Sequence, residues 1–219
     1  MIRTNNHNNK ENNYNKENNW HWFALHVRSN TEIAIVNMLR TKLDTNKYLA
    51  FIIVKEALFW EKGIPRLYHK IIFPGYVIVQ TKSNADDVIR DMQPIVNISK
   101  SNIYKILSYD NGSSSNNIML CKSEQAMWES LIDSDFFIRA SFGIIEKGSL
   151  QVTTGPLIGK EDAIKKLNKY KSRAIIDVEF AGEFMEMSLV LKLLDNKPDS
   201  KSNGKSDKKP DKKPDKKPK

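Results

Sequence analysis

The chain has 219 residues, a formal net charge of +9 and one cysteine, Cys121. A single cysteine excludes an intrachain disulfide framework and a zinc site built from several cysteines. No apolar run approaches the roughly 18–20 residues that cross a bilayer, so we expect neither a membrane-spanning helix nor a secretory leader, and we expect a cytoplasmic protein.

The compositions of the two ends of the chain disfavour folding. Residues 1–19 are dominated by Asn, and residues 196–219 contain mostly Lys, Asp, Pro and Ser. Such segments bury too little apolar surface to offset a backbone entropy cost of about 1–2 kcal/mol per residue, so we predict that both are disordered. From residue 197 onward, ten Lys and four Asp supply +6 of the net charge. This tail is either a solubilising appendage or a weak, salt-sensitive contact for nucleic acid.

Residues 20–135 predict a domain of mixed secondary structure. Four apolar or aromatic runs are typical of strands, at 22–27, 49–54, 66–72 and 76–80. Three segments with helical spacing of apolar residues predict helices, at 30–44, 84–92 and 122–133. Asn84 or Ser83 is a plausible cap for the second helix and Ser123 for the third. Cys121 ends an apolar run and is expected to be an inert core thiol. The predicted fold class is α+β, with helices flanking a mostly antiparallel sheet.

The remaining segments before the tail have a different pattern. Residues 93–122 are less regular and contain a polar loop at 111–116. From residue 142 onward, three short runs bounded by turn residues are typical of strands, at 150–152, 174–180 and 184–191. They predict a small β-barrel over 142–195, joined to the first domain by a linker at 136–141. Residues 161–167 depart from this pattern, because their spacing would also form a helical turn.

Two segments together resemble one protein family. Residues 71–77 (IIFPGYV), preceded by the tryptophan-led run 22–26, resemble the N-terminal domain of NusG-type transcription elongation factors. Residues 147–152 (KGSLQV) and 154–159 (TGPLIG) resemble the KOW motif of the same family. The resemblance implies an NGN-like domain followed by a KOW barrel of the SH3-like kind.

The chain departs from the housekeeping members of that family. The usual second glycine of the KOW loop is replaced, since residues 159–162 read GKED, and the segment after this loop is strongly basic. These departures resemble the LoaP group of operon-specific antiterminators more than they resemble the RfaH and UpxY groups.

The resemblance implies an interface with RNA polymerase. In the family, the N-terminal domain lays an apolar patch on the clamp helices of the largest polymerase subunit. Phe73 and Tyr76 match positions of that contact, and Ile78 lies on the same strand face as Tyr76. Docking would remove exposed aromatic surface from water, at about 25 cal/mol per Å². The alternative is that the three side chains belong to the core of the sheet.

Basic side chains form a second candidate interface. Arg28 matches a family position that faces non-template DNA, and Lys62 and Arg66 lie in a turn that resembles the family's tip hairpin. The C-terminal candidates share one dense run of positive charge around an aromatic side chain: Lys160, Lys165, Lys166, Lys169, Tyr170, Lys171 and Arg173. Phosphate contacts by the cations and base stacking on Tyr170 predict binding to an RNA hairpin in an operon leader. The alternative for each is a solvated surface side chain.

The sequence therefore predicts an antitermination factor that acts as a monomer without a cofactor or metal. It contains no glycine-rich phosphate loop and no hydrolase motif, so we expect no enzymatic activity. His21 and His26 point to opposite faces of one strand and cannot bind a metal together. The alternative function is that of a general NusG-like adaptor whose KOW domain binds a ribosomal protein or Rho. A KOW-bearing RNA-binding protein unrelated to transcription is a second alternative.

Overall fold

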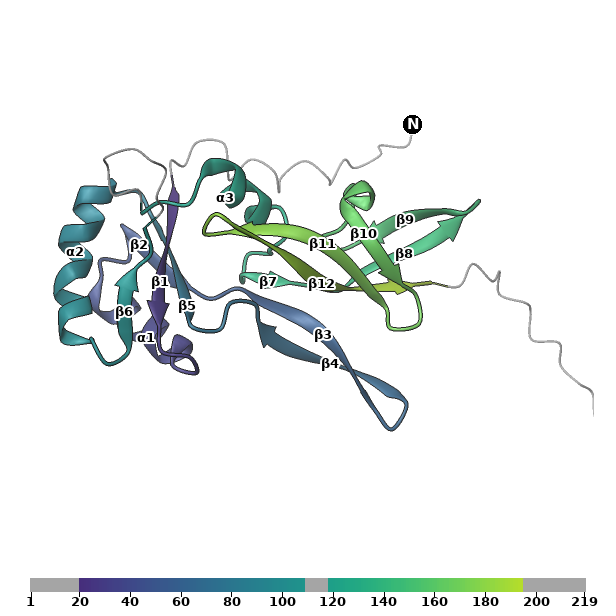
Figure 1. The fold of residues 1–219 in the computed structure, drawn as a ribbon, viewed down its shortest axis with the longest axis horizontal. Helices are drawn as coiled ribbons and strands as arrows, with labels where there is room; N and C mark the ends of the chain where they lie inside the picture. Colours follow the sequence, from purple (N-terminus) through teal and green to yellow (C-terminus); the bar gives the residue numbers. More distant parts are fainter. Residues whose placement is uncertain (1–19, 109–117, 195–219) are drawn as a thin grey trace, which may run out of the picture.

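The structure, a computed structural model, describes residues 20–108 and 118–194. The two termini and the polar loop at 111–116, for which the sequence suggested disorder or a loop, lie outside the described residues. Within these residues the fold is mixed α+β, with an antiparallel N-terminal sheet, three α-helices and a curled C-terminal sheet of five strands (Figure 1). The predicted fold class is confirmed at this level.

The N-terminal sheet has four antiparallel strands in the order β2-β5-β1-β6. Their bounds are β1 (His21–Val27), β2 (Tyr48–Phe51), β5 (Tyr76–Thr81) and β6 (Ile103–Ile106). Alternation along β1 sends Phe23 and Leu25 to one face and Trp22 and Ala24 to the other, and all four side chains are buried. Because both faces of this part of β1 are covered, residues 22–25 are all apolar.

Two helices cover one face of this sheet. α1 (Glu32–Lys42) and α2 (Ala85–Ile98) pack side chains such as Leu39 and Met92 into one apolar cluster with the strands. The Asn84 side chain accepts a hydrogen bond of 2.9 Å from the Asp87 N–H and caps α2, as predicted. The helix continues past its predicted end at residue 92 and through Pro94. The buried side chains in its last two turns supply packing that overrides the low helical propensity of proline.

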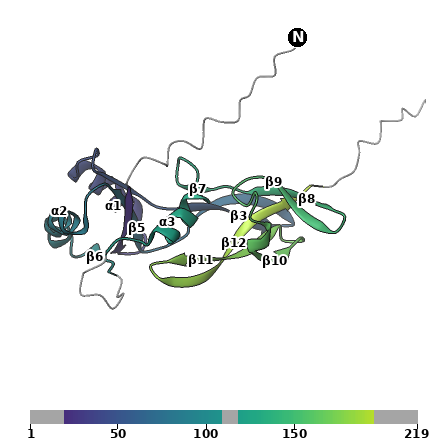
Figure 2. The same ribbon diagram turned by 90° about the horizontal axis from the view of Figure 1, so that it is seen from above.

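A long hairpin leaves the N-terminal sheet. It consists of β3 (Val54–Glu61) and β4 (Ile64–Ile71), and in two views it runs beside β12 (Figure 1, Figure 2). Its two turn residues, Lys62 and Gly63, both have positive φ, as a tight type I′ turn requires. β7 (Phe137–Ile138) pairs in parallel with the start of β3. The segment predicted as a linker therefore contributes a short strand to the hairpin's sheet.

The C-terminal sheet is curled but open. Its strands are β8 (Ser141–Glu146), β9 (Ser149–Thr154), β10 (Ile164–Asn168), β11 (Arg173–Phe180) and β12 (Glu183–Leu193). They follow the order β10-β11-β12-β8-β9, and the two edge strands β9 and β10 do not pair with each other within the described residues. The sheet is thus a curled half-barrel in the region where a small β-barrel was predicted. The predicted helical turn is limited to a 3-10 turn at Glu161–Ala163, after which β10 begins.

The turn after β9 has a geometric need for glycine. Gly155 has a φ of +95°, and a Cβ atom there would lie 2.6 Å from the Ser141 Cα. The Ser141 hydroxyl in turn accepts a hydrogen bond of 3.2 Å from the Leu157 N–H. The Gly-Pro turn is therefore held tightly against the start of β8.

The two sheets share one core through α3 (Lys122–Glu129). Buried side chains of both sheets, including Ile78 and Met187, pack in one cluster with the fully buried Trp128. α3 ends at residue 129, short of the predicted 133. The predictions that Cys121 is a core thiol and that Ser123 caps this helix are wrong. Cys121 is exposed, and its Sγ accepts the Glu124 N–H at 3.4 Å as the helix cap.

Candidate functional site

An aromatic cluster lies where the two sheets meet. Phe180, the last residue of β11, stacks on Phe73 with ring centroids 3.8 Å apart and planes 15° apart. The Trp128 ring meets Phe73 edge-on at 5.1 Å, and the Tyr76 ring meets Phe180 edge-on at 5.6 Å. The C-terminal sheet therefore covers the segment that resembles the family's polymerase-binding strand.

The exposed apolar patch expected from the sequence is absent in this arrangement. Phe73 is 7% exposed and Ile78 is 1% exposed, while Tyr76 is half-buried. In this arrangement Phe73 and Ile78 belong to the core, and Tyr76 packs against it, as the alternative assignment expected. Binding of polymerase by the three residues stays a prediction.

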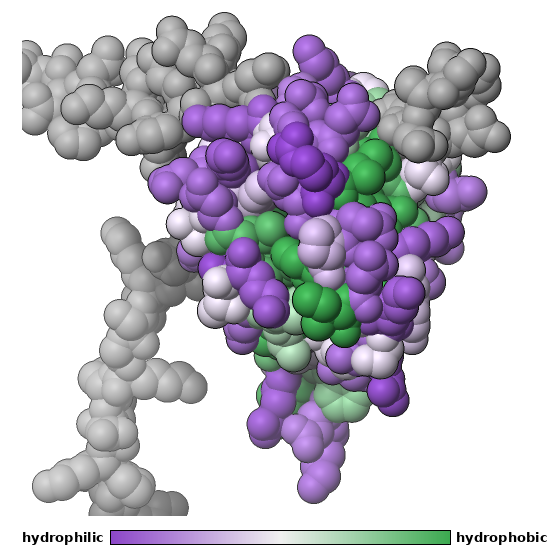
Figure 3. Space-filling view, turned by 90° about the vertical axis from the view of Figure 1, so that its left-hand side faces the viewer, coloured by the Kyte–Doolittle hydropathy of each residue, from purple (hydrophilic) through white to green (hydrophobic). Residues whose placement is uncertain are grey.

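The end of the molecule that carries α1 and α2 offers no obvious replacement for that patch. Figure 3 shows several separate apolar areas there, interrupted by hydrophilic side chains. Exposed apolar residues of these elements include Ile33 and Ile98. Apolar side chains scattered in this way are normal for a protein surface and do not by themselves mark an interface.

Hydrogen bonds reinforce the seam between the two sheets. The Trp128 Nε1–H donates to the Glu179 carbonyl at 2.8 Å, and the Ala181 N–H donates to the Glu124 Oε1. Glu124 is only 2% exposed, and burial is the main cause that raises the pKa of its carboxyl group. The sequence pattern did not single out Glu124, because one acidic residue in the first turn of a helix is common.

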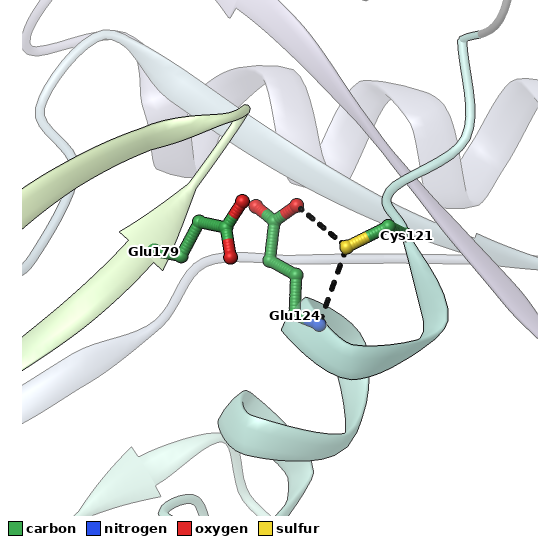
Figure 4. Close-up of side chains that lie close together, drawn as sticks. All are labelled: Cys121, Glu124 and Glu179. Carbon is green, nitrogen blue, oxygen red and sulfur yellow. Dashed lines mark hydrogen bonds between the residues drawn. The ribbon is translucent and has the colours of Figure 1, made fainter.

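Glu124 also belongs to a small cluster of possible ligand atoms. The Cys121 Sγ and carboxylate oxygens of Glu124 and Glu179 all lie within 4.8 Å of one another (Figure 4). The Sγ already accepts the Glu124 N–H, and the Glu124 carboxylate accepts the Ala181 N–H. A hydrogen bond within the α3 cap therefore accounts for the Cys121 group, and a hydrogen bond from the β11–β12 turn accounts for the Glu124 group.

A second buried carboxylate shapes the turn before β5. Glu32 is 3% exposed, and its Oε1 accepts the Gly75 N–H at 2.6 Å. The Gly75 carbonyl accepts the Val27 N–H at 2.8 Å, and Gly75 has a φ of +85°. These contacts fix the Phe-Pro-Gly turn that places Phe73 at the seam. Glu32 follows a predicted helix start, but its reach to residue 75 could not be read from the sequence.

The predicted RNA-binding residues separate into two groups. Those on or near the β10–β11 turn are exposed: Lys166, Lys169, Tyr170 and Lys171. Tyr170 is 94% exposed. The Lys171 N–H donates to the Asn168 Oδ1 at 3.0 Å, which fixes the turn that presents Tyr170. The turn thus brings one aromatic face and three cations to the same edge of the sheet.

The other three C-terminal cations have partners within the protein. Lys165 forms an ion pair with Asp177, which raises the pKa of the lysine. The Lys160 ammonium donates to the carbonyls of Ser130 and Pro156 at 3.3 and 3.1 Å. Arg173 reaches the long hairpin, as described below.

The predicted DNA-facing residues are exposed but lie on different elements. Arg28 follows β1, and Lys62 lies at the tip of the β3–β4 hairpin. Arg66, on β4, forms an ion pair of 3.0 Å with Glu61. These positions neither support nor oppose a contact with DNA.

Comparison with known proteins adds no assignment. No protein-family model matches the sequence, and no curated protein matches it either. None of the helices in the described ranges is long and apolar enough to cross a membrane. A functional proposal therefore depends on the geometry of the two surfaces and on the two segments that resemble NusG-type factors.

Proposed function

We propose that the protein is a transcription elongation factor of the antitermination type, which binds RNA through its C-terminal sheet and RNA polymerase through its N-terminal unit. On this proposal the N-terminal unit is an NGN-like domain, and the half-barrel is a KOW domain of the SH3-like kind. The single observation that carries the RNA-binding part is the exposed Tyr170 between Lys169 and Lys171. Neither lysine has an acidic partner within the described residues.

The chemistry of the β10–β11 turn fits single-stranded or looped RNA. Stacking of one base on an aromatic side chain contributes about 1–3 kcal/mol to binding. Lysine side chains that neutralise phosphates release counterions and make the affinity depend on salt. Unpaired bases in an RNA loop can reach an exposed ring, whereas bases inside an RNA duplex cannot. The turn is therefore suited to an RNA hairpin loop.

Substitutions in the turn test the RNA-binding part in the full chain. Tyr170→Ala should weaken binding of an RNA hairpin about 5-fold to 150-fold, the equivalent of one lost stacked base. It should leave the melting temperature unchanged, because the ring is almost fully exposed. Phe184→Ala, which removes another exposed aromatic ring, from β12, is the matched control and should retain wild-type RNA binding. Equal RNA affinity in wild type and Tyr170→Ala would reject the proposal and favour an adaptor that binds a ribosomal protein or Rho.

The polymerase part of the proposal requires the C-terminal sheet to move. Phe73 can meet the clamp helices only after Phe180 leaves it, so the observed arrangement competes with polymerase binding. Phe180→Ala should therefore increase co-precipitation of core RNA polymerase. Phe73→Ala combined with Tyr76→Ala should abolish it. Unchanged speed and terminator read-through of a reconstituted elongation complex, with both the wild type and Phe180→Ala, would contradict the proposal.

A further inference from the structure

A pocket of about 120 Å³ lies between the long hairpin and the C-terminal sheet. Its charged lining comes from three strands, with Lys55 on β3, Lys70 on β4 and Arg173 on β11. Ser188 and Tyr68 add two hydroxyl-bearing side chains to the lining, and no carboxylate is part of it. The pocket is therefore cationic and is built from both halves of the described chain.

The pairing of the hairpin brings two of these charges together. Lys55 and Lys70 are direct cross-strand partners, an arrangement that destabilises a sheet when the charges are alike. No ion pair joins Lys55, Lys70 or Arg173 to a carboxylate anywhere in residues 20–108 or 118–194. The free protein thus contains three close cations whose charge the described residues leave uncompensated.

Hydrogen bonds orient two of the cations without neutralising them. The Lys55 Nζ donates to the Ser188 carbonyl at 2.8 Å, and the Arg173 guanidinium donates to the Leu58 carbonyl at 3.4 Å. Burial, followed by the charges of Lys70 and Arg173, lowers the pKa of Lys55 to about 8. An anion in the pocket would relieve this repulsion and accept the remaining N–H groups.

We propose that this pocket binds a phosphate group through Lys55, Lys70 and Arg173. The arginine fork supplies paired donors for two phosphate oxygens, and the two ammonium groups supply charge and further donors. Two of the cations belong to the hairpin and the third belongs to the C-terminal sheet. The site is therefore complete only while the hairpin and this sheet are in contact. Phosphate therefore stabilises that arrangement by mass action. The site does not depend on the proposed transcriptional function.

Thermal unfolding and calorimetry of the full chain with inorganic phosphate test the site. At fixed ionic strength, phosphate should raise the melting temperature in a saturable manner that chloride does not reproduce. Lys70→Gln and Arg173→Gln should each weaken phosphate binding about 10-fold or more, as expected for a lost hydrogen bond between charged groups. Lys147→Gln, which removes an exposed charge from the β8–β9 turn, should retain wild-type binding.

Melting temperatures of the variants without phosphate show whether a variant has lost its fold or only its phosphate binding. Lys70→Gln should melt at or above the wild-type temperature without phosphate, because it removes a repulsion. Phosphate stabilisation of Lys70→Gln equal to that of wild type would overturn the proposal. An equal loss of phosphate binding in Lys147→Gln, or an equal rise in melting temperature with chloride, would also overturn it.

If inorganic phosphate binds, a further experiment with RNA shows whether the natural ligand is an RNA backbone or a small phosphate-bearing molecule. Competition by an RNA hairpin and weaker RNA binding by Lys70→Gln assign the pocket to a backbone phosphodiester. Unchanged RNA affinity in Lys70→Gln assigns it to a small phosphate-bearing molecule. Tyr170→Ala should bind inorganic phosphate normally in either case, which separates this site from the RNA-binding turn.

Discussion

Replacement of Lys55 by methionine is expected to stabilise the protein at pH 7 in phosphate-free buffer, although the lysine makes a hydrogen bond. Methionine keeps the length of the side chain and removes the charge. Burial and the neighbouring cations lower the pKa of Lys55 from 10.5 to about 8. This shift corresponds to about 3 kcal/mol against the charged form at pH 7. Loss of the hydrogen bond to Ser188 offsets about 1 kcal/mol, so the net gain is about 2 kcal/mol.

The gain should depend on pH in a defined direction. The pKa of Lys55 is lower in the folded state than in the unfolded state, so the unfolded state binds more protons between pH 8 and pH 10.5. Stability of the wild type therefore rises with pH across this window. Lys55→Met lacks this contribution, and its advantage should shrink by about 2 kcal/mol between pH 7 and pH 9.5.

Urea unfolding of both proteins at pH 7 and pH 9.5 measures the effect. Other groups that titrate identically in both proteins do not contribute to the difference between the two free energies of unfolding. Lys166→Met, at an exposed position, should change the free energy of unfolding by no more than about 0.5 kcal/mol at either pH. A Lys55→Met protein that is less stable at pH 7, or whose advantage does not vary with pH, would refute the reasoning.

Three further substitutions test the contacts that hold the fold. Phe180→Ala should lower the free energy of unfolding by about 3–5 kcal/mol, whereas Phe184→Ala, 76% exposed on β12, should lower it by no more than about 0.5 kcal/mol in the same urea titration. Gly159→Ala should lower the free energy of unfolding by about 1–2 kcal/mol, because its φ is positive, and Gly155→Ala should lower it clearly more. Both glycines have positive φ, but only at Gly155 would a Cβ atom collide with backbone atoms. Equal melting temperatures of the two variants would contradict this. Glu32→Ala should cost about 1.5–3 kcal/mol and speed amide hydrogen exchange in the Phe-Pro-Gly turn.

Much of the secondary structure followed from local patterns. Apolar runs were sufficient to predict β1 and β5, and helical spacing of apolar residues was sufficient to predict α1 and α2. Each of these elements has a face that must be buried. β6 was missed because its four residues are too few to show alternation. The end of α2 was placed too early, because packing of buried side chains carries the helix through Pro94.

The candidate site was harder to predict, for a physical reason. Phe73 and Phe180 have the apolar character of both a core and an interface, and only the docking of the two sheets distinguishes these roles. The pocket cations illustrate the same point. Arg173 was assigned to a basic run because it is close in sequence to Lys171, yet it faces the hairpin through a contact with a residue 115 positions away. Local spacing carries no information on such contacts.

The short strand β7 has a kinetic consequence. Only Arg139 and Ala140 separate it from β8, and the Ala140 N–H donates to the Glu56 carboxylate at 2.7 Å. Even if β7 detached from β3, residues 136–141 would extend no more than about 20 Å. The released sheet would then remain at an effective concentration on the order of millimolar relative to its old contact surface. A partner that binds the same surface at a far lower concentration must bind it much more tightly than the sheet does. Such a partner can bind only while the sheet is detached, so its association rate is set by how often the sheet detaches.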